Sequence, residues 1–184
     1  MSFPPLAFVD LETTGATATA DRITEIGIIE VDADGVREWS TLVNPGVPIS
    51  SFVESLTGIS SAMVASAPAF TEVANEVLAR LDGRLFIAHN ARFDYGFLKN
   101  EFKRAGLDFR ATVLCTVKLS RKLFPQHPRH NLDSLIERHG LQVSARHRAL
   151  GDARLIHQFW QQLLANVEPE VLAATVAKLT ARPS

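Results

Sequence analysis

Residues 6–12 read Leu6-Ala7-Phe8-Val9-Asp10-Leu11-Glu12, a mainly apolar run that ends with two acids. A short apolar run of this kind predicts a buried β-strand. Successive side chains of a strand point to opposite faces, so Asp10 and Glu12 share one face. Ala7, Val9 and Leu11 point to the other face and pack there. The stretch therefore predicts a core strand with two carboxylates together at its end.

Two more strand patterns follow. Residues 23–31 are rich in β-branched side chains, and Asp34-Gly35 is a hairpin signal ahead of residues 36–43. Asn44-Pro45-Gly46 then closes the unit. We expect three antiparallel strands in the first part of the chain.

Helical patterns interleaved with a short strand dominate the rest of the chain. Strands first and then helices predict one α/β domain over residues 1–184, with a mixed central sheet flanked by helices. Glycines stand just beyond several helix ends, as helix stops do. The expected elements are helices over 70–81, 91–104, 131–139 (with Asn131 as N-cap), 149–165 and 168–181, and a strand over 85–88.

The composition is that of an ordinary globular protein. Hydrophobic residues make up 46% and charged residues 21% of the 184 positions. Cys115 is the only cysteine, which excludes an intrachain disulfide and a cysteine-based zinc cluster. The first residues lack the pattern of a secretory signal, and no run of about 18 apolar residues could span a membrane. We expect a cytoplasmic protein that does not contact membranes.

Charge is unevenly distributed although the net charge is only −1. Residues 1–40 hold eight acids and two bases, whereas residues 118–148 hold seven bases and two acids. One interpretation is two unrelated solvated faces. The other is an acidic metal pocket beside a basic rim that holds a phosphate backbone. Composition alone does not separate them.

Asp10 and Glu12 are the first candidates for chemistry. Two neighbouring carboxylates at the end of a buried strand repel each other and are costly to desolvate. Mg²⁺ and Mn²⁺ prefer carboxylate oxygens and relieve that cost. Taken alone, an Asp-x-Glu pair is better explained by two solvent-facing residues at a strand end.

Three further residues lie where strands give way to helices. Asp94 follows the strand at 85–88, at the start of a helix, where α/β sheets collect binding groups. Asp152 lies in the first turn of the longest helix, with His147 in the loop before it. Either acid alone is equally an acid favoured by the helix dipole. A histidine five residues ahead of a metal-binding acid can reach a water and act as a base near neutral pH.

Three motifs in order resemble those of one known family. They are Asp10-Leu11-Glu12-Thr13-Thr14-Gly15, then His89-Asn90-Ala91-Arg92-Phe93-Asp94, then His147-Arg148-Ala149-Leu150-Gly151-Asp152. They match the DEDDh superfamily of 3′→5′ exonucleases. The resemblance is strongest to the proofreading (epsilon) subunits of bacterial DNA polymerase III, over about residues 5–165. A tyrosine four residues before the last aspartate would instead indicate the DEDDy branch.

The resemblance implies an RNase H-like fold and hydrolysis of phosphodiesters with two divalent cations, Mg²⁺ or Mn²⁺. Carried over by position, Asp10 would bridge both metals, Glu12 and Asp152 would complete one site, and Asp94 would hold the second metal. His147 would take a proton from the attacking water. Four carboxylates would offset the charge of the two cations.

Substrate contacts are implied less specifically. The backbone around the first motif and the aromatic residue before Asp94 point to Leu11, Thr13, Thr14, Phe93 and Asn90 as substrate-binding residues, although Phe93 could equally belong to the core. The His-Gly-Ile segment usual in the family is Thr57-Gly58-Ile59 here. Arg129 and Arg148 are interpreted as solvated arginines.

The expected activity is removal of nucleotides from 3′ ends of single-stranded DNA, in proofreading or repair, with release of 5′-mononucleotides. A polymerase or repair protein is a conceivable partner. One alternative is the same chemistry on RNA, because the motifs do not read a 2′-hydroxyl. Another is a catalytically silent module that binds nucleic acid or partner proteins.

Overall fold

The computed structural model describes residues 3–181. Its centre is a five-stranded sheet in the order β3-β2-β1-β4-β5. β1 and β2 are antiparallel, as are β2 and β3, whereas β4 and β5 run parallel to β1, so the sheet is mixed. The strands are β1 (Leu6–Thr13), β2 (Ile23–Asp32), β3 (Gly35–Leu42), β4 (Leu85–Ala88) and β5 (Val113–Cys115).

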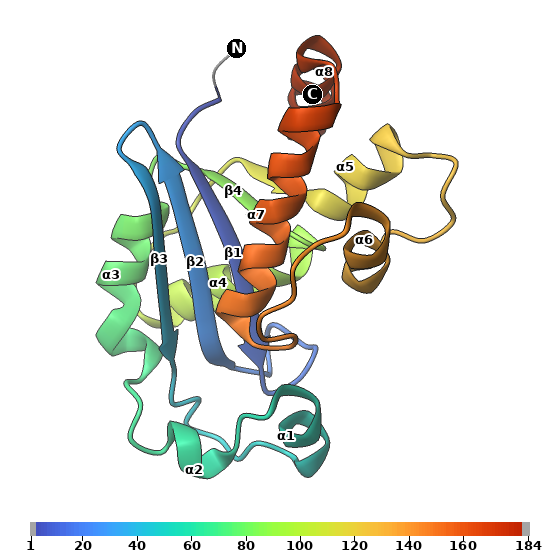
Figure 1. Cartoon of the computed structure of the whole chain (residues 1–184). Helices are drawn as coiled ribbons and strands as arrows, with labels where there is room; N and C mark the ends of the chain where they lie inside the picture. Colours follow the sequence, from blue (N-terminus) through green and yellow to red (C-terminus); the bar gives the residue numbers. More distant parts are fainter. Residues whose placement is uncertain (1–2, 182–184) are drawn as a thin grey trace.

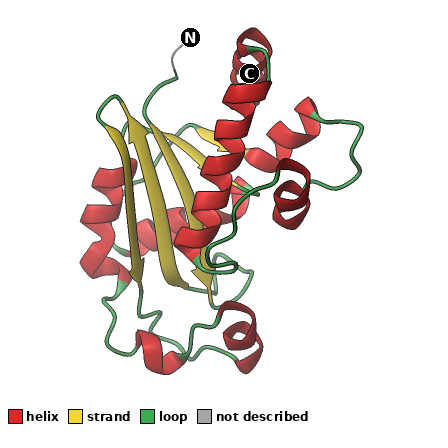
Figure 2. Ribbon diagram, in the orientation of Figure 1, coloured by secondary structure: helices red, strands yellow, loops and turns green. Residues whose placement is uncertain are grey.

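Helices cover both faces of the sheet (Figures 1 and 2). α7 crosses one face, with α5, α6 and α8 beside it, and α3 and α4 lie behind the other; α1 and α2 lie below the sheet as drawn. The helices are α1 (Ser51–Thr57), α2 (Ser61–Val64), α3 (Phe70–Leu81), α4 (Ala91–Arg104), α5 (Thr116–Leu123), α6 (Leu132–His139), α7 (Ala149–Asn166) and α8 (Pro169–Thr180).

β1 separates two hydrophobic cores. Leu6 and Phe8 pack with the buried residues of α7, whereas Ala7, Val9 and Leu11 pack with those of α3 and α4. This alternation places Asp10 and Glu12 on the face that α7 covers. The predicted separation of the two carboxylates from Ala7, Val9 and Leu11 is therefore confirmed.

Most of the elements expected from the sequence are confirmed. The three opening strands are antiparallel, and the predicted hairpin between β2 and β3 turns through Ala33 and Asp34, with Gly35 as the first residue of β3. Asn131 caps α6 by accepting a hydrogen bond from the backbone N–H of Ser134, and Gly140 ends that helix with a φ of 63°. The chemical reasons used for these ends, a side-chain N-cap and a left-handed glycine, hold in the structure.

Four short elements were not predicted: α1, α2, β5 and α5. Two of them begin with serine caps, because Ser50 and Ser60 accept hydrogen bonds from Val53 and Met63. No helix in the described part of the chain is long and apolar enough to cross a membrane. That all 184 residues form one domain stays a prediction.

Candidate active site

The site begins at the end of β1, where Asp10 and Glu12 follow Phe8 on the face beneath α7. Oδ2 of Asp10 is buried and has no hydrogen-bond partner among the described residues. Buried carboxylate oxygens are normally satisfied, because an unsatisfied one keeps its full desolvation cost. The orphaned oxygen of Asp10 therefore lies where a ligand is required.

Asp152 joins this pair from the first turn of α7. The carboxylates of Asp10, Glu12 and Asp152 offer oxygens that all lie within 4.8 Å of one another. Asp152 is only 4% exposed, and its Oδ1 accepts a hydrogen bond of 3.3 Å from the backbone N–H of His147. Residues 142 positions apart in the sequence thus form one acidic group, which we call the acid triad.

Asp94 lies beside the acid triad rather than within it. β4 ends at Ala88 and the chain enters α4 at once, which buries Asp94 in the first turn at 3% exposure. Burial raises the pKa of Asp94 to about 8, while backbone N–H groups of Asp94 and Leu11 oppose the rise. Asp94 also raises the pKa of Asp10 more than any other charged neighbour does. All four predicted acids therefore meet at one end of the sheet.

Negative charge exceeds positive charge among these acids, and the pKa values of the carboxyl groups are raised. Burial, followed by the charges of Asp94, Glu12 and Asp152, raises the pKa of Asp10 well above its usual value. Burial and neighbouring carboxylates raise the pKa of Glu12 to about 8. Burial also raises the pKa of Asp152. Hard divalent cations reverse such repulsion, and an all-oxygen donor set fits them.

His147 enters the site from the loop before α7. Its backbone is left-handed, with a φ of 63°, an uncommon conformation for a residue with a side chain. The only other such residue in the described chain is Asn90, the N-cap of α4. Backbone strain of this kind collects at functional sites. Both exceptions stand in the predicted motifs, next to helices that carry site acids.

Glu25 is a residue of this region that sequence reasoning missed. It lies opposite Glu12 in the β1–β2 register, is 5% exposed, and accepts hydrogen bonds from Nε and Nη2 of Arg148 and from the backbone N–H of Ala149. The interpretation of Arg148 as a solvated arginine is therefore wrong. The ion pair and the hydrogen bond of Glu25 instead connect the first residues of α7 to β2. Only the strand register could have indicated this pairing.

Arg146 is the second residue that sequence reasoning did not single out. Its Nη1 donates to Oδ2 of Asp152 at 2.6 Å, and its Nε donates to Oδ1 of Asp133 at 2.9 Å. Its charge lowers the pKa values of Asp10, Glu12 and Asp152, against the rise caused by burial. A single guanidinium thus reaches into a group of four carboxylates.

The predicted substrate-binding residues surround the acids in different ways. Leu11 is buried in the core behind β1, so it could meet a substrate only through its backbone. The hydroxyl of Thr13 donates to the carbonyl of Gly15, and that of Thr14 donates to Asp21. Phe93 is half-buried and packs on the core, and Asn90 is exposed. Their roles stay predictions.

Thr57, which replaces the histidine usual in the family, is buried at the end of α1. Its hydroxyl donates to the carbonyl of Val53 and accepts from the backbone N–H of Ile59. Thr57 therefore stabilises its own turn. Its side chain does not replace a histidine that would contact a terminal base.

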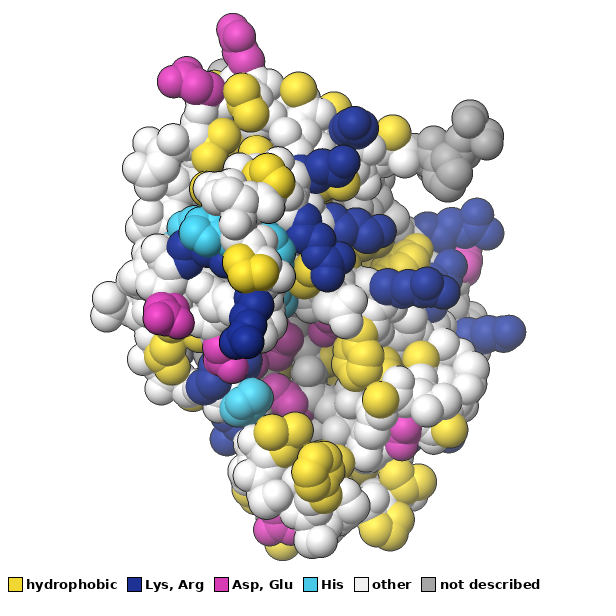
Figure 3. All heavy atoms as spheres, turned by 90° about the vertical axis from the view of Figure 1, so that its right-hand side faces the viewer, with side chains coloured by type: hydrophobic (Ala, Val, Ile, Leu, Met, Phe, Trp, Pro, Cys, Tyr) yellow, Lys and Arg dark blue, Asp and Glu magenta, His cyan; other side chains and the backbone are white. Residues whose placement is uncertain are grey.

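Acidic side chains lie in a hollow of the surface in the view of Figure 3. Lys and Arg side chains gather on one side of the hollow, and hydrophobic side chains lie on the other. Lys118, Arg121 and Lys122 of α5 are exposed, and no ion pair of theirs is found within residues 3–181. This arrangement favours the interpretation of the uneven charge as an acidic pocket beside a basic rim.

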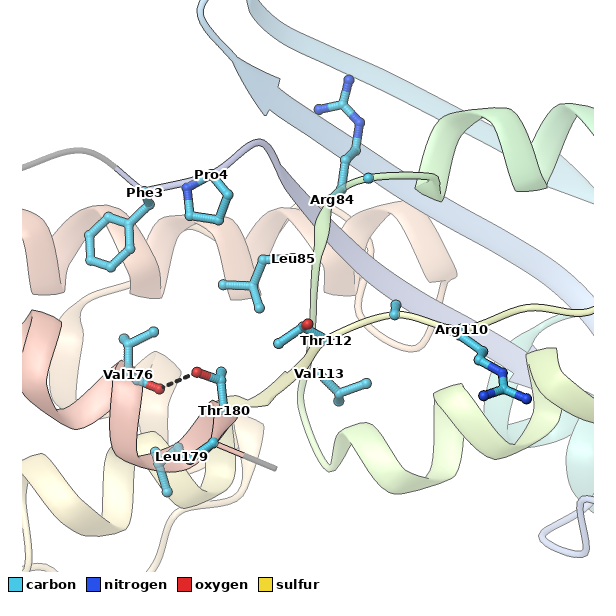
Figure 4. A pocket seen from close by; sticks show the side chains of 13 residues that line it. Phe3, Pro4, Arg84, Leu85, Arg110, Thr112, Val113, Val176, Leu179 and Thr180 are labelled. Atoms are coloured by element: carbon cyan, nitrogen blue, oxygen red, sulfur yellow. Dashed lines mark hydrogen bonds between the residues drawn. The ribbon is translucent and has the colours of Figure 1, made fainter. Parts of the chain in front are cut away.

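A separate cavity of about 640 Å³ lies at the other end of the sheet (Figure 4). Its lining includes Phe3, Leu85 and Val113, next to or at the starts of β1, β4 and β5, and Val176 and Leu179 of α8. The acids stand at the ends of the strands and these residues at their starts, so the cavity is not part of the acid site.

Comparison with known proteins agrees with this geometry. The protein-family model described as "Exonuclease" (RNase_T) matches residues 7–159. The chain is 38% identical over 160 residues to a DNA polymerase III PolC-type of Caldanaerobacter subterraneus. The matched region is 86% of this chain and 11% of that protein. The chain is also 38% identical over 159 residues to the 3′-5′ exonuclease DinG of Bacillus subtilis. The matched region is 85% of this chain and 17% of that protein.

A solved structure shows the same likeness. Exonuclease X in complex with 5′ overhanging duplex DNA superposes with a TM-score of 0.75 at 26% identity, covering 96% of this chain and 99% of that one. The fold and the buried acids define a nuclease-type α/β protein, and the expected RNase H-like fold is confirmed. The chain belongs to the exonuclease family. It spans less than a fifth of the length of the two relatives named above.

Proposed function

We propose that this chain is a 3′→5′ exonuclease that removes 5′-mononucleotides from the 3′ ends of single-stranded DNA. The observation that carries the proposal is the orphaned, buried Oδ2 of Asp10 within a group of four carboxylates. Family membership supports the reaction, and the similarity to DinG, a 3′-5′ exonuclease, supports its polarity. The duplex with an overhang bound by exonuclease X supports DNA as the substrate.

Two divalent cations, Mg²⁺ or Mn²⁺, fit the donor set. Asp10, Glu12 and Asp152 would hold one and Asp10 with Asp94 the other. When bound, the cations supply positive charge at the scissile phosphate and make water more acidic. All four residues are carboxylates, of which Asp94 and Asp152 are buried and Asp10 and Glu12 partly buried, and this donor set supports the assignment.

The residues of the chain would divide the remaining work. His147 would accept a proton from the attacking water as its oxygen bonds to phosphorus and the bond to the 3′-oxygen breaks. The products are a 5′-mononucleotide and a strand one nucleotide shorter. Glu25 and Arg148 hold the start of α7, which keeps Asp152 and His147 beside the end of β1.

The basic rim would hold the incoming strand. Lys118, Arg121 and Lys122 are exposed side chains of α5, and Figure 3 shows Lys and Arg side chains gathered on one side of the hollow. Contacts to phosphates require no base sequence and weaken as salt rises. Leu11, Thr13, Thr14, Phe93 and Asn90 are proposed to contact the terminal nucleotide. A polymerase or repair partner and a cytoplasmic location stay proposals, the former in keeping with the PolC-type relative.

One experiment tests the activity and its alternatives together. Single-stranded DNA, a mismatched primer–template and single-stranded RNA of one sequence, each labelled at the 5′ end, are incubated with the protein in Mg²⁺ or in EDTA. We expect progressive shortening of DNA in Mg²⁺ and none in EDTA. Faster shortening of RNA would make RNA the substrate, and binding without shortening in Mg²⁺ or Mn²⁺ would indicate a silent module.

A further inference from the structure

Arg146 makes a contact that a metal-binding role of Asp152 does not explain. Its Nη1 lies 2.6 Å from Oδ2 of Asp152, while its Nε lies 2.9 Å from Oδ1 of Asp133 at the start of α6. The arginine side chain is 25% exposed and the Asp152 side chain 6%. Arg146 therefore pairs with a buried acid through one nitrogen and with an exposed acid through another.

Arg146 is also alone in this position. Within residues 3–181, no other Lys, Arg or His forms an ion pair within 4 Å of Asp10, Glu12, Asp94 or Asp152. Arg148, two residues further on, is occupied by Glu25. The single positive charge of Arg146 thus offsets part of the repulsion among four carboxylates.

A divalent cation and this guanidinium compete for the same acid. A cation at the acid triad takes carboxylate oxygens as ligands, and a guanidinium can only donate hydrogen bonds. A bound cation would also repel the arginine, because like charges a few ångströms apart inside a protein are costly. Metal binding at Asp152 and the Arg146 contact therefore oppose each other.

The backbone around Arg146 is held while its side chain can move. A Cβ at Gly151 would overlap the carbonyl of Ala145, so the loop lies directly against α7. On the other side, the ion pair of Arg148 with Glu25 fixes the residue next to His147. Displacement of Arg146 thus requires rotation of a flexible side chain and no rearrangement of the loop.

We propose that Arg146 is the internal counter-ion of the metal-free acid site and that a divalent cation bound there displaces its guanidinium from Asp152. Arg146 then sets the metal affinity of the site, since the ion pair must be broken whenever a cation binds. This inference rests on the proposed function, because it requires that the acids bind a divalent cation.

The test compares Arg146→Met with the wild type with and without metal. Methionine keeps an unbranched stem but removes the charge. In EDTA at pH 8 we expect the variant to melt about 3 °C or more below the wild type. In saturating Mg²⁺ this gap should close. By linkage, calorimetric titration with Mg²⁺ should show the variant binding at least about fivefold more tightly.

Arg154→Met is the matched control, because Arg154, on α7, also pairs with an acid, Glu38 of β3, and that acid is not part of the site. Its melting shift should be equal in both buffers and its Mg²⁺ affinity unchanged. An equal gap for Arg146→Met in both buffers, or Mg²⁺ binding no tighter than wild type, would overturn the inference. If the wild type bound neither Mg²⁺ nor Mn²⁺, the proposed function would fall with it. If the wild type bound Mg²⁺ and Asp10→Asn did not, the metal site would stand, and the result for Arg146→Met would then test the Arg146 inference alone.

Discussion

Asp10 combines two properties that rarely occur together in a protein core. Its Oδ2 is buried without a hydrogen-bond partner among residues 3–181, and burial, followed by the charges of three other acids, raises its pKa. Each property costs stability. A residue that costs stability in this way has to be explained by what it binds. A hard cation explains both properties.

Asp10→Asn is therefore expected to abolish hydrolysis without unfolding the protein. The amide keeps the shape of the side chain but loses the charge that a cation needs. Activity on single-stranded DNA should fall by at least about a thousandfold. The melting temperature in EDTA should stay equal or rise, because one of four repelling charges is removed. Wild-type activity, or an unfolded variant by circular dichroism, would contradict this expectation.

His147→Ala separates the base from the metal ligands. We expect kcat to fall by about 10²–10⁴-fold, because proton transfer loses its acceptor, while KM changes little. Mg²⁺ affinity measured by calorimetry should be retained, since the side chain is no ligand in this account. A variant that changes only KM would argue against a role as base.

The residues of the site differ in how far the sequence could predict them. Asp10 and Glu12 share a face because strands alternate, a rule that operates within seven residues. Glu25 meets Arg148 across 123 positions, and that contact depends on the β1–β2 register and on where α7 docks. Arg146 reaches Asp152 through a loop with no regular pattern. Local rules carry no information on either pairing.

At the scale of elements, the site depends on how α7 lies on β2. A Cβ at Gly27 would meet the backbone N of Leu150 at 2.5 Å, so the helix and the strand touch through their backbones. Glu25, two residues earlier on β2, accepts the N–H of Ala149 at 2.8 Å. A glycine that permits close approach and an acid that binds the helix start together place Asp152.

Glu25→Ala should weaken this junction and the reaction with it. It leaves Arg148 and the N–H of Ala149 without their partner, so we expect the free energy of unfolding to fall by about 2–3 kcal/mol. The value of kcat should also fall, because Asp152 and His147 lose their support. Urea denaturation and steady-state kinetics measure the two effects.

Glu38→Ala is the matched comparison for Glu25. It breaks the ion pair with Arg154, which joins the same helix to β3, but both side chains are 40% exposed. Its cost in unfolding free energy should stay below about 1 kcal/mol, with kcat unchanged. Equal effects of the two substitutions would show that Glu25 is an ordinary surface contact.

The junction of β4 with α5 gives the fold a pH dependence. Nδ1 of His89 lies 2.8 Å from Oγ1 of Thr116, whose hydroxyl donates to the carbonyl of Ala88, and Nε2 is buried with no hydrogen-bond partner in the described part of the chain. Burial lowers the pKa of His89 from 6.5 to about 4. The unfolded chain binds a proton near pH 6.5 and the folded chain does not. Stability from His89 is therefore present above pH 6.5 and is lost as pH falls toward 4.

His89→Gln removes this titration. Between pH 7 and pH 5 the free energy of unfolding should fall by about 2 kcal/mol more in the wild type than in the variant. Urea denaturation of both proteins at the two pH values measures the difference, in which the titration of all other groups cancels. The same pH dependence in both proteins would show that His89 keeps an ordinary pKa in the folded state.

Two of the missed elements, β5 and α2, share a physical cause. β5 has three residues and α2 four, too few for a hydrophobic period to repeat. Their placement comes from tertiary contacts: β5 pairs with β4, and Val64 of α2 packs with Ile49 and Ile59. α3, α4 and α7 repeat their apolar positions over three turns or more, so local patterns sufficed for them.

At the scale of the whole molecule, the two ends of the sheet differ in chemistry. The ends of β1 and β4 lie near the acids, whereas the strand starts and α8 line the separate cavity.

The salt concentration should affect the binding of DNA and the binding of metal differently. Raising it should weaken binding of a single strand through Lys118, Arg121 and Lys122 more than it weakens Mg²⁺ binding to the buried acids. Fluorescence anisotropy measures the binding of the strand, and calorimetry measures the binding of Mg²⁺. A larger effect of salt on Mg²⁺ binding than on strand binding would contradict this expectation.

The most direct test of the central claim follows the first nucleotide released. A single-stranded DNA labelled on its 3′-terminal nucleotide is mixed with the wild type or with Asp10→Asn in Mg²⁺, and the earliest products are separated by size. We expect the wild type to release the label first as a 5′-mononucleotide and the Asp10→Asn variant to release none. Early label in longer fragments, or equal release by the variant, would contradict it.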